Sequence, residues 1–191
     1  MRTLAVLFLT AGLCNQTQAQ IDSVQYDLGY AFVEGIYANY QEFRADQPSI
    51  QHRFEARNHQ LYVWEDSTQE MVLVDPSKVW GYSLDGNVYI SFEDGFWRII
   101  NIGRLSQFSA IVMRTIRTVD AFGFPTESQS RSMVQLFFNF SDGAVYELSS
   151  KNLIPFVENS PEISSKYKNL KKIKARGLVS VLQAYNQLYP I

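Results

Sequence analysis

The residue types that most often carry chemistry in proteins are few and far apart in this chain. It has two histidines, His52 and His59, and a single cysteine, Cys14. The histidine spacing fits neither a helical i, i+4 pair nor a short zinc motif, and no cysteine is available to complete one. The sequence has no G-x-S-x-G elbow, no glycine-rich phosphate loop and no dinucleotide fingerprint. It therefore predicts no catalytic residue, no metal site and no cofactor.

Acidic residues leave one enzymatic alternative open. Glycoside hydrolysis needs two carboxyl groups about 5–9.5 Å apart across a cleft. Glu93 and Asp94 are adjacent, so a strand would turn them to opposite faces. Asp94 also precedes a glycine, which favours a role in a tight turn. The alternative function is therefore a carbohydrate-active hydrolase with a carboxylate pair, not identified by the sequence, in an aromatic-lined cleft.

Four residues in the middle of the chain could form a ligand-binding platform. Alternation along predicted strands places Trp80, Tyr82, Tyr89 and Arg98 on one face of a sheet. Aromatic and arginine side chains dominate recognition surfaces, so these four could stack on a sugar ring or on a partner's apolar patch. The competing interpretation is that a second layer covers this face, because an aromatic stripe is more often core than surface.

A run of basic residues near the carboxyl terminus is a second candidate surface. It consists of Lys166, Lys168, Lys171, Lys172, Lys174 and Arg176. Such a run could attract an anionic surface of the cell envelope. The simpler interpretation is the solvated side of an amphipathic helix.

The four platform residues all lie in the stretch Val79–Ile100. The sequence of this stretch predicts three antiparallel strands. Asp85-Gly86 and Asp94-Gly95 both suit a two-residue type I′ turn, because glycine takes positive φ freely and aspartate tolerates it. If each pair is such a turn, the strands align Tyr82 with Tyr89, Gly81 with Ile90, and Phe92 with Trp97.

Other segments extend this ribbon. Asn39 is a plausible cap for a short helix over Tyr40–Ala45, and Ala121–Ser130 is expected to be a loop. The further predicted strands lie around Phe54, at Leu61–Trp64, Met71–Val74, Phe108–Val119 and Met133–Phe140, and at Ala144–Leu148 after Asp142-Gly143. We therefore expect an α+β fold with a curved, mostly antiparallel meander sheet of about seven to nine strands, barrel-like or sandwich-like.

The carboxyl-terminal part changes to a helical period. Ser160-Pro161-Glu162 is a good helix start, and Asn169–Leu188 carries an apolar stripe with helical spacing. We expect a helical segment over about residues 160–188, packed on one face or across one end of the sheet. Gly177 interrupts the stripe, so either a kink or close packing is expected there.

The start of the chain has the pattern of a secretory signal peptide. Arg2 precedes the apolar run Leu4–Leu13, and small residues precede the predicted cleavage after Ala19. Residues 1–19 are thus the predicted signal peptide, and residues 20–191 one domain. Lipid attachment through Cys14 is the rival interpretation, but the bulky Leu13 before it argues against that motif. The chain is expected in the periplasm or outside the cell.

The composition of the chain limits the classes of partner that we expect. The net charge is −2 and the isoelectric point about 5.7, whereas nucleic-acid-binding domains are typically strongly basic. After the signal, no segment has the roughly 20 apolar residues of a membrane-spanning helix. The partners we expect are an unknown protein or glycan of the cell envelope.

Short motifs are scattered over most of the chain. They are Glu34-Gly35-Ile36-Tyr37 with Phe43 and Pro48-Ser49, Val79-Trp80-Gly81-Tyr82 with Asp85-Gly86-Asn87-Val88-Tyr89-Ile90, Gly103-Arg104-Leu105-Ser106, and Asp142-Gly143 with Leu148. With these motifs the chain resembles a loosely defined family of uncharacterised exported proteins from Gram-negative bacteria. The resemblance implies export and a β-rich domain, and it carries no activity or ligand. The expected function is a non-enzymatic exported binding or envelope-associated module.

Overall fold

The computed structural model of the chain describes residues 30–167 and 169–191. Its strands are β1 (Gly35–Tyr37), β2 (Phe54–Arg57), β3 (Gln60–Glu65), β4 (Glu70–Leu73), β5 (Gly81–Leu84), β6 (Asn87–Phe92), β7 (Gly95–Asn101), β8 (Leu105–Val119), β9 (Pro125–Asn139) and β10 (Val145–Glu147). Its helices are α1 (Tyr40–Arg44), α2 (Ser150–Val157), α3 (Pro161–Lys166) and α4 (Ala175–Leu188), with the short 3₁₀-helices η1 (Pro76–Lys78) and η2 (Leu170–Lys172). The predicted signal peptide, its cleavage site and Cys14 lie outside the described residues.

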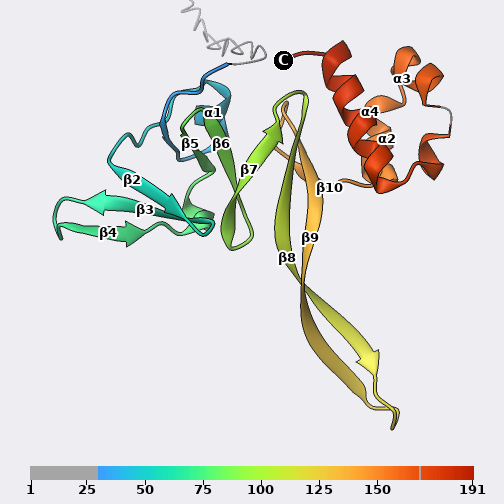
Figure 1. Cartoon of the computed structure of the whole chain (residues 1–191), viewed down its shortest axis with the longest axis horizontal. Helices are drawn as coiled ribbons and strands as arrows, with labels where there is room; N and C mark the ends of the chain where they lie inside the picture. Colours follow the sequence, from blue (N-terminus) through green and yellow to red (C-terminus); the bar gives the residue numbers. More distant parts are fainter. Residues whose placement is uncertain (1–29, 168) are drawn as a thin grey trace, which may run out of the picture.

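Seven strands form one curled antiparallel sheet in the order β1-β5-β6-β7-β8-β9-β10 (Figure 1). From β5 to β10 every neighbour in the sheet is also the neighbour in sequence, as the short turns predict. β1 pairs with β5, with Ile36 opposite Tyr82. The predicted α+β class, the antiparallel meander and the carboxyl-terminal helix are confirmed.

The two central turns differ in how well the sequence locates them. Asp85 (φ 51°) and Gly86 (φ 71°) join β5 to β6 with the predicted register, in which Tyr82 lies opposite Tyr89. The next turn comes one residue earlier than predicted, because its central residues are Glu93 and Asp94.

Close packing at Gly95 accounts for this difference. Gly95 is the first residue of β7, and it lies opposite Phe92. A Cβ there would lie only 3.3 Å from the backbone oxygen of His59, so this glycine serves a close approach of two chain segments. Ile90 now lies opposite Trp97 instead of Ile99. The register moves by two residues, so the side chains of β6 and β7 keep their predicted faces.

The strands β2, β3 and β4 form a separate three-stranded sheet and do not extend the large one. Figure 1 shows this small sheet to one side of β5 and β6. Its Leu61 is buried together with Tyr82 and Phe96 of the large sheet, and Phe54 and Val63 pack around them. The small sheet is therefore the second layer over one face of β5–β7.

The main core lies on the other face of the large sheet. α1 begins at its predicted cap, where the Asn39 side chain accepts a hydrogen bond from the Glu42 N–H (3.1 Å). The helix buries Phe43 among aromatic residues of the sheet. The fully or nearly buried members of this core are Phe32, Tyr37, Phe43, Val88, Ile90, Trp97, Ile99, Phe108, Ala110, Leu136, Phe138 and Phe140.

β8 and β9 form a long hairpin, with Leu105 opposite Asn139 at one end and Val119 opposite Pro125 at the other. The predicted loop at Ala121–Ser130 is therefore wrong: only residues 120–124 connect the strands. Residues 126–130 of β9 are polar because both faces of the strand meet water, so their composition resembles that of a loop. The hairpin between β9 and β10 is present as predicted, with Asp142-Gly143 in its turn.

The carboxyl-terminal part is a helical layer at one end of the sheet (Figure 1). The predicted single segment is divided into α3, η2 and α4. Ser160 caps α3 as predicted, by accepting from the Ile163 N–H (3.4 Å). A Cβ at Gly177 would lie 2.5 Å from Ile173 Cγ2, so the expected close packing is found there. α2 was not predicted, because Pro155 inside it hides the helical signal.

Apolar residues join this layer to the sheet. Leu105 and Phe137 of the large sheet are buried with Leu153, Val181 and Leu182 of the helices. In the described part of the chain, no helix is long and apolar enough to cross a membrane.

Candidate functional site

Trp80 is half-buried and packs against the main core, not on the predicted platform. Its ring stacks on Phe43 with centroids 3.9 Å apart and meets Phe138 nearly at right angles. β5 begins only at Gly81, so the strand alternation that predicted its face does not extend back to Trp80. The indole packs with the main core, whereas Tyr82 packs under the small sheet, so the two side chains face opposite layers.

The other three platform residues differ strongly in exposure. Tyr82 stacks on Tyr89 with centroids 4.6 Å apart, but the small sheet covers it and leaves only 3% of it exposed. This burial, with a smaller effect of Tyr89, raises the pKa of the Tyr82 hydroxyl. Tyr89 is half-buried, and Arg98 lies opposite it and is exposed. The four residues therefore do not share one exposed face.

The two histidines differ in their surroundings, and only His59 has contacts to the core. His59 stacks on Trp97 (centroids 4.3 Å apart), and its Nδ1 is 3.1 Å from the backbone oxygen of Phe96. His52 is exposed in the segment before β2. Among the described residues, no group of three or more histidine, cysteine or acidic side chains is placed to hold a metal ion.

One buried acid, Asp46, is 6% exposed and fully engaged in hydrogen bonds. It accepts from the Tyr37 hydroxyl (2.8 Å), the Tyr30 hydroxyl (2.7 Å) and the Val33 N–H (3.0 Å). The hydrogen bond to Asp46, followed by burial, raises the pKa of Tyr30 to about 12. Asp46 thus fastens the segment before β1 to the body, which is a structural role.

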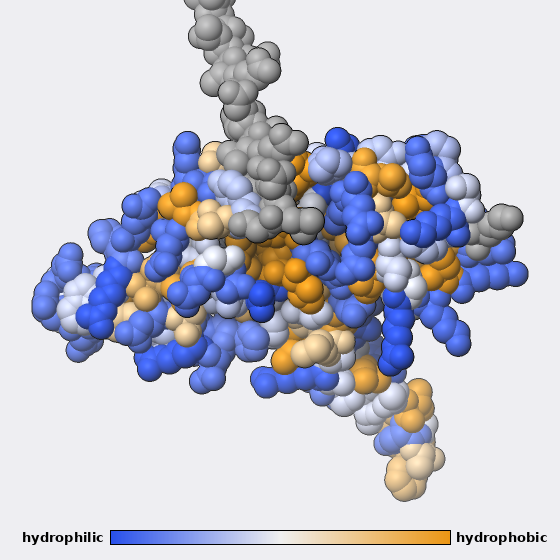
Figure 2. Space-filling view, turned by 45° about the horizontal axis from the view of Figure 1, so that its top comes forward, coloured by the Kyte–Doolittle hydropathy of each residue, from blue (hydrophilic) through white to orange (hydrophobic). Residues whose placement is uncertain are grey.

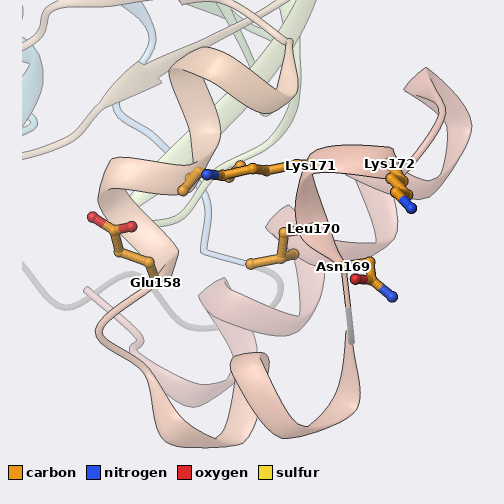
Figure 3. A pocket seen from close by; sticks show the side chains of 6 residues that line it. Glu158, Asn169, Leu170, Lys171 and Lys172 are labelled. Atoms are coloured by element: carbon orange, nitrogen blue, oxygen red, sulfur yellow. The ribbon is translucent and has the colours of Figure 1, made fainter.

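Two open cavities lie in the carboxyl-terminal half. The first, about 370 Å³, is lined by Ile154, Glu158 and residues 169–172 of the basic run (Figure 3). The basic residues that the structure describes are exposed, and Lys168 lies outside the described residues. Among the described residues that line this cavity, Glu158 is the one acid, so they do not supply the carboxylate pair that glycoside hydrolysis needs.

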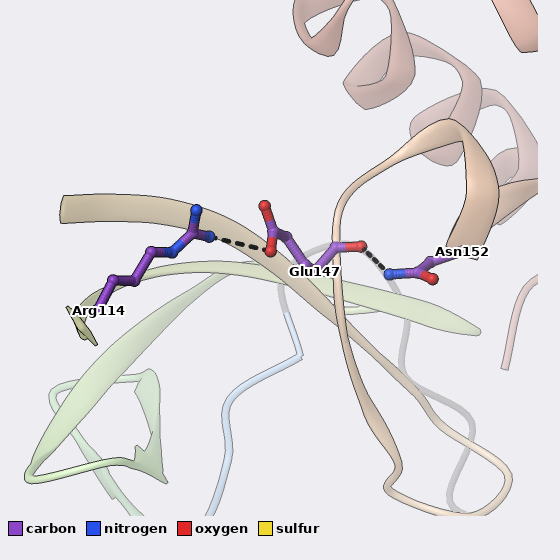
Figure 4. Close-up of polar contacts among 3 residues, drawn as sticks. All are labelled: Arg114, Glu147 and Asn152. Atoms are coloured by element: carbon purple, nitrogen blue, oxygen red, sulfur yellow. Dashed lines mark hydrogen bonds and ion pairs between the residues drawn. The ribbon is translucent and has the colours of Figure 1, made fainter. Parts of the chain in front are cut away.

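The second cavity, about 530 Å³, lies where the β8–β9 hairpin leaves the body. Glu147 of β10 is the one acid in its lining. The Glu147 carboxylate accepts a hydrogen bond from Arg114 of β8 (3.0 Å), and its backbone oxygen accepts from Asn152 of α2 (2.9 Å; Figure 4). These contacts fix the root of the hairpin to the helical layer.

Beyond this root the hairpin projects away from the body as two strands alone (Figure 1). We call residues 111–133 the arm. Every residue from Met113 to Gln129 is exposed. An isolated two-stranded ribbon is marginally stable in water, so an arm of this length is an unusual feature that a structural role in the body does not explain.

The end of the arm, residues 119–125, is apolar, as Figure 2 shows at the end of the projection. Val119, Phe122 and Phe124 are 68%, 85% and 66% exposed. Asp120 holds this tip: one carboxylate oxygen accepts from the backbone N–H groups of Phe122 and Phe124, both at 2.9 Å. The two phenylalanines are thus presented to the outside by an ordered turn.

The arm also has free strand edges. β7 pairs with β8 only as far as Phe108, and β10 pairs with β9 from Leu136 onward. Within the described residues, no strand lies against the outer edge of either arm strand beyond these points. Unpaired edges expose a row of backbone donors and acceptors, and they are sites at which a further strand can add.

Sequence reasoning did not identify the arm. One signal in the sequence could have identified it. The alternating run that ends at Val119 is much longer than the strands predicted before it, so its end has no neighbouring strand to pair with, and two phenylalanines follow around Gly123. Comparisons of the chain with family models, with curated proteins and with solved structures find no match. The argument for a function therefore rests on the geometry of this chain.

Proposed function

We propose that this protein is an exported, non-enzymatic binding module that contacts a partner in the cell envelope through the β8–β9 arm. The observation that carries the proposal is an exposed two-stranded arm with open edges and an apolar tip. Soluble domains seldom expose clustered large apolar residues unless these meet a partner. Val119, Phe122 and Phe124 gather at one end of the arm, at the greatest distance from the body.

The chemistry of the arm favours a polypeptide as the partner. Its open edges need N–H and C=O groups in return, and only another backbone supplies both in a regular row. The arm between body and tip carries charged side chains as well as apolar ones, and Arg117 and Glu127 form an ion pair across it (2.7 Å). A lipid surface would satisfy the apolar tip but would leave these edges and charges without partners.

Site-specific photo-crosslinking in cells tests this proposal. A photoreactive residue in place of Phe122 is expected to form covalent protein adducts, because the tip lies in the contact. The same residue in place of Val72, which is also exposed but lies on β4 of the small sheet, is the matched control and is expected to give none. Equal adduct yields from both positions, or none from Phe122, would contradict the proposal.

A further inference from the structure

We propose that the polypeptide bound by the arm is a second copy of this chain, whose β9 pairs with β9 of the first copy in antiparallel orientation around Gln129. This inference rests on the proposed function, and it names the partner of the same surface. A two-fold axis through Gln129 makes the contact self-complementary, as in most homodimers.

The backbone N–H and C=O groups on the open edge of β9 belong to the residues that this pairing requires. Antiparallel strands bond through every second residue. Near the body, Gln135 and Asn139 direct their backbone groups to the β10 side, where they bond to Leu148 (2.8 Å) and Ala144 (3.0 Å). Glu127, Gln129 and Arg131 have the same parity, so their N–H and C=O groups lie on the open edge. In the proposed register these are the residues that bond to the second copy.

The charges of β9 are complementary to themselves. The sequence Glu127-Ser128-Gln129-Ser130-Arg131 places an acid and a base at equal distances from its centre. In the antiparallel pair, Glu127 lies directly opposite Arg131 of the second copy, and Arg131 opposite Glu127. Opposite charges at such positions favour pairing. Arg131 forms no ion pair within the described residues, so this register would provide its carboxylate.

Apolar residues also align in this register. Val119 lies opposite Pro125, and Ile111 opposite Met133, within one arm. The pairing around Gln129 brings Pro125 opposite Met133 of the second copy. The result is an apolar row across four strands, formed twice by symmetry. It would cover Val119 and Met133, which are 68% and 71% exposed in the single chain.

The tip then reaches the root of the second arm. Pro125 opposite Met133 is the last pair of this register, because Leu148 already bonds to the Gln135 backbone (2.8 Å). The tip therefore ends beside Gln135 and Leu148 of the second copy, and Met133, Gln135 and Leu148 all line the 530 Å³ cavity. Phe122 and Phe124 flank Gly123, so the cavity at the root is the surface nearest to them. The dimer therefore accounts for the tip as well as for the edge.

The outer edge of β8 does not offer an equivalent pairing. A two-fold axis through Thr115 would place Arg117 opposite Met113 and Arg114 opposite Ile116. β8 has no acid to meet these arginines. The charge pattern therefore favours β9 as the self-pairing strand.

Charge exchange is the first test, made on the full chain by sedimentation at several concentrations. Wild type is expected to dimerise, and Glu127→Arg and Arg131→Glu are each expected to weaken the dimer about tenfold or more, because like charges then oppose each other. The double variant Glu127→Arg/Arg131→Glu restores opposite charges and is expected to recover most of the affinity. A wild-type chain that is monomeric throughout, or a double variant weaker than both single variants, would overturn the inference.

Disulfide trapping tests the register, in a chain that carries Cys14→Ser. Cysteine in place of Gln129 lies at the two-fold axis, about 5.5 Å from its counterpart, and is expected to form a covalent dimer on oxidation. Cysteine in place of Thr115 is the matched control. It lies in the same row, but three strand spacings, about 14 Å, would separate the two copies of it. Trapping at Thr115 with none at Gln129 would refute this register.

The outcomes separate this inference from the proposed function. A monomeric chain whose Phe122 position still cross-links to a different envelope protein would refute the dimer and leave the binding function in place. A monomeric chain that cross-links to nothing, yet sediments with anionic lipid vesicles unless it carries Phe122→Ser, would refute both and assign the tip to the membrane.

Discussion

The indole of Trp80 stacks face to face on Phe43, and this pair joins α1 to the strand that begins one residue later. Tyr37 and Phe138 meet the same indole edge-on. Aromatic pairs of this kind contribute beyond the area they bury. A residue that could have met a ligand therefore serves the core.

We expect Trp80→Ala to lower the free energy of unfolding by about 3 kcal/mol, the lower end of the range for truncating a large aromatic side chain in a core, because Trp80 is half-buried. Arg98→Ala is the control from the same predicted platform, and because Arg98 is exposed it should stay within about 0.5 kcal/mol of wild type. Urea denaturation of both variants measures this. A Trp80→Ala chain as stable as Arg98→Ala would contradict the placement of Trp80 in the core.

The carboxylate of Glu42 accepts hydrogen bonds from both sides of α1. Partial burial alone would raise the pKa of its carboxyl group, but hydrogen bonds donated by the Ala38 N–H (2.8 Å) and the Ser49 hydroxyl (2.8 Å), with others, outweigh this and hold the pKa below its usual value. The carboxylate thus links the start of α1 to the segment that follows it.

The lowered pKa of Glu42 makes its contribution dependent on pH. In a group of this kind the stabilisation is present above the unfolded pKa and is lost as the pH falls through the folded pKa. We expect Glu42→Gln to be less stable than wild type at neutral pH, and the gap to narrow under acidic conditions below the usual glutamate range. Thermal unfolding across this range measures it. A gap that widens in acid would contradict the assigned network.

At the scale of elements, the arm is separate from the body. Residues 113–129 are exposed throughout, the Arg117–Glu127 ion pair lies within the arm, and the Arg114–Glu147 ion pair lies at its root. Few buried contacts hold such a segment, so it should open locally at low cost. Its conformation should therefore matter little for the stability of the rest.

Shortening the arm tests this separation. We expect a chain in which Asn-Gly replaces residues 115–129 to unfold within about 1 kcal/mol of wild type, because Arg114 and Ser130 are cross-strand partners that a two-residue turn can join. Calorimetry measures the stability, and sedimentation shows whether self-association disappears. A loss of several kcal/mol would mean that the arm stabilises the body.

The elements also show where sequence reasoning succeeds. Asp85-Gly86 needs positive φ at both positions, so its residue types locate the turn. Gly95 is a glycine because His59 approaches it, a tertiary cause that no local pattern contains. Turn-like composition in Ala121–Ser130 reflects strands wetted on both faces. The four platform residues do not share an exposed face for a related reason. Alternation assigns a face, but it does not tell that β2–β4 cover Tyr82 or that Trp80, one residue before β5, packs against the other layer.

At the scale of the whole molecule, Asn186 joins the helical layer to the sheet. Its side-chain oxygen accepts from the Leu105 N–H (3.0 Å), and its amide donates to the Leu105 oxygen (2.9 Å). The fit is close, because a Cβ at Gly103 would lie 2.5 Å from Asn186 Cγ. One amide thereby satisfies both backbone groups at the first residue of β8.

We expect Asn186→Ala to destabilise the protein by about 1–3 kcal/mol, because both backbone groups of Leu105 lose their partner. Gln187→Ala, at the exposed neighbouring position of the same helix, is the control and should change little. Chemical denaturation followed by helix and tryptophan signals measures both. Equal effects of the two substitutions would contradict the role assigned to Asn186.

The pairing of β1 with β5 has a consequence for the order of assembly. Each strand from β5 to β10 is joined to its neighbour by a short turn. Pairing of β1 with β5 instead closes a loop that contains residues 38–80. The entropic cost of such closure grows with the logarithm of the intervening length, and distant contacts slow folding. β1 should thus be among the last strands to take its place. Amide protection should reach Trp80, whose N–H donates to the Tyr37 oxygen of β1 (2.9 Å), after it reaches Ser91, whose N–H donates to the Trp80 oxygen (2.8 Å).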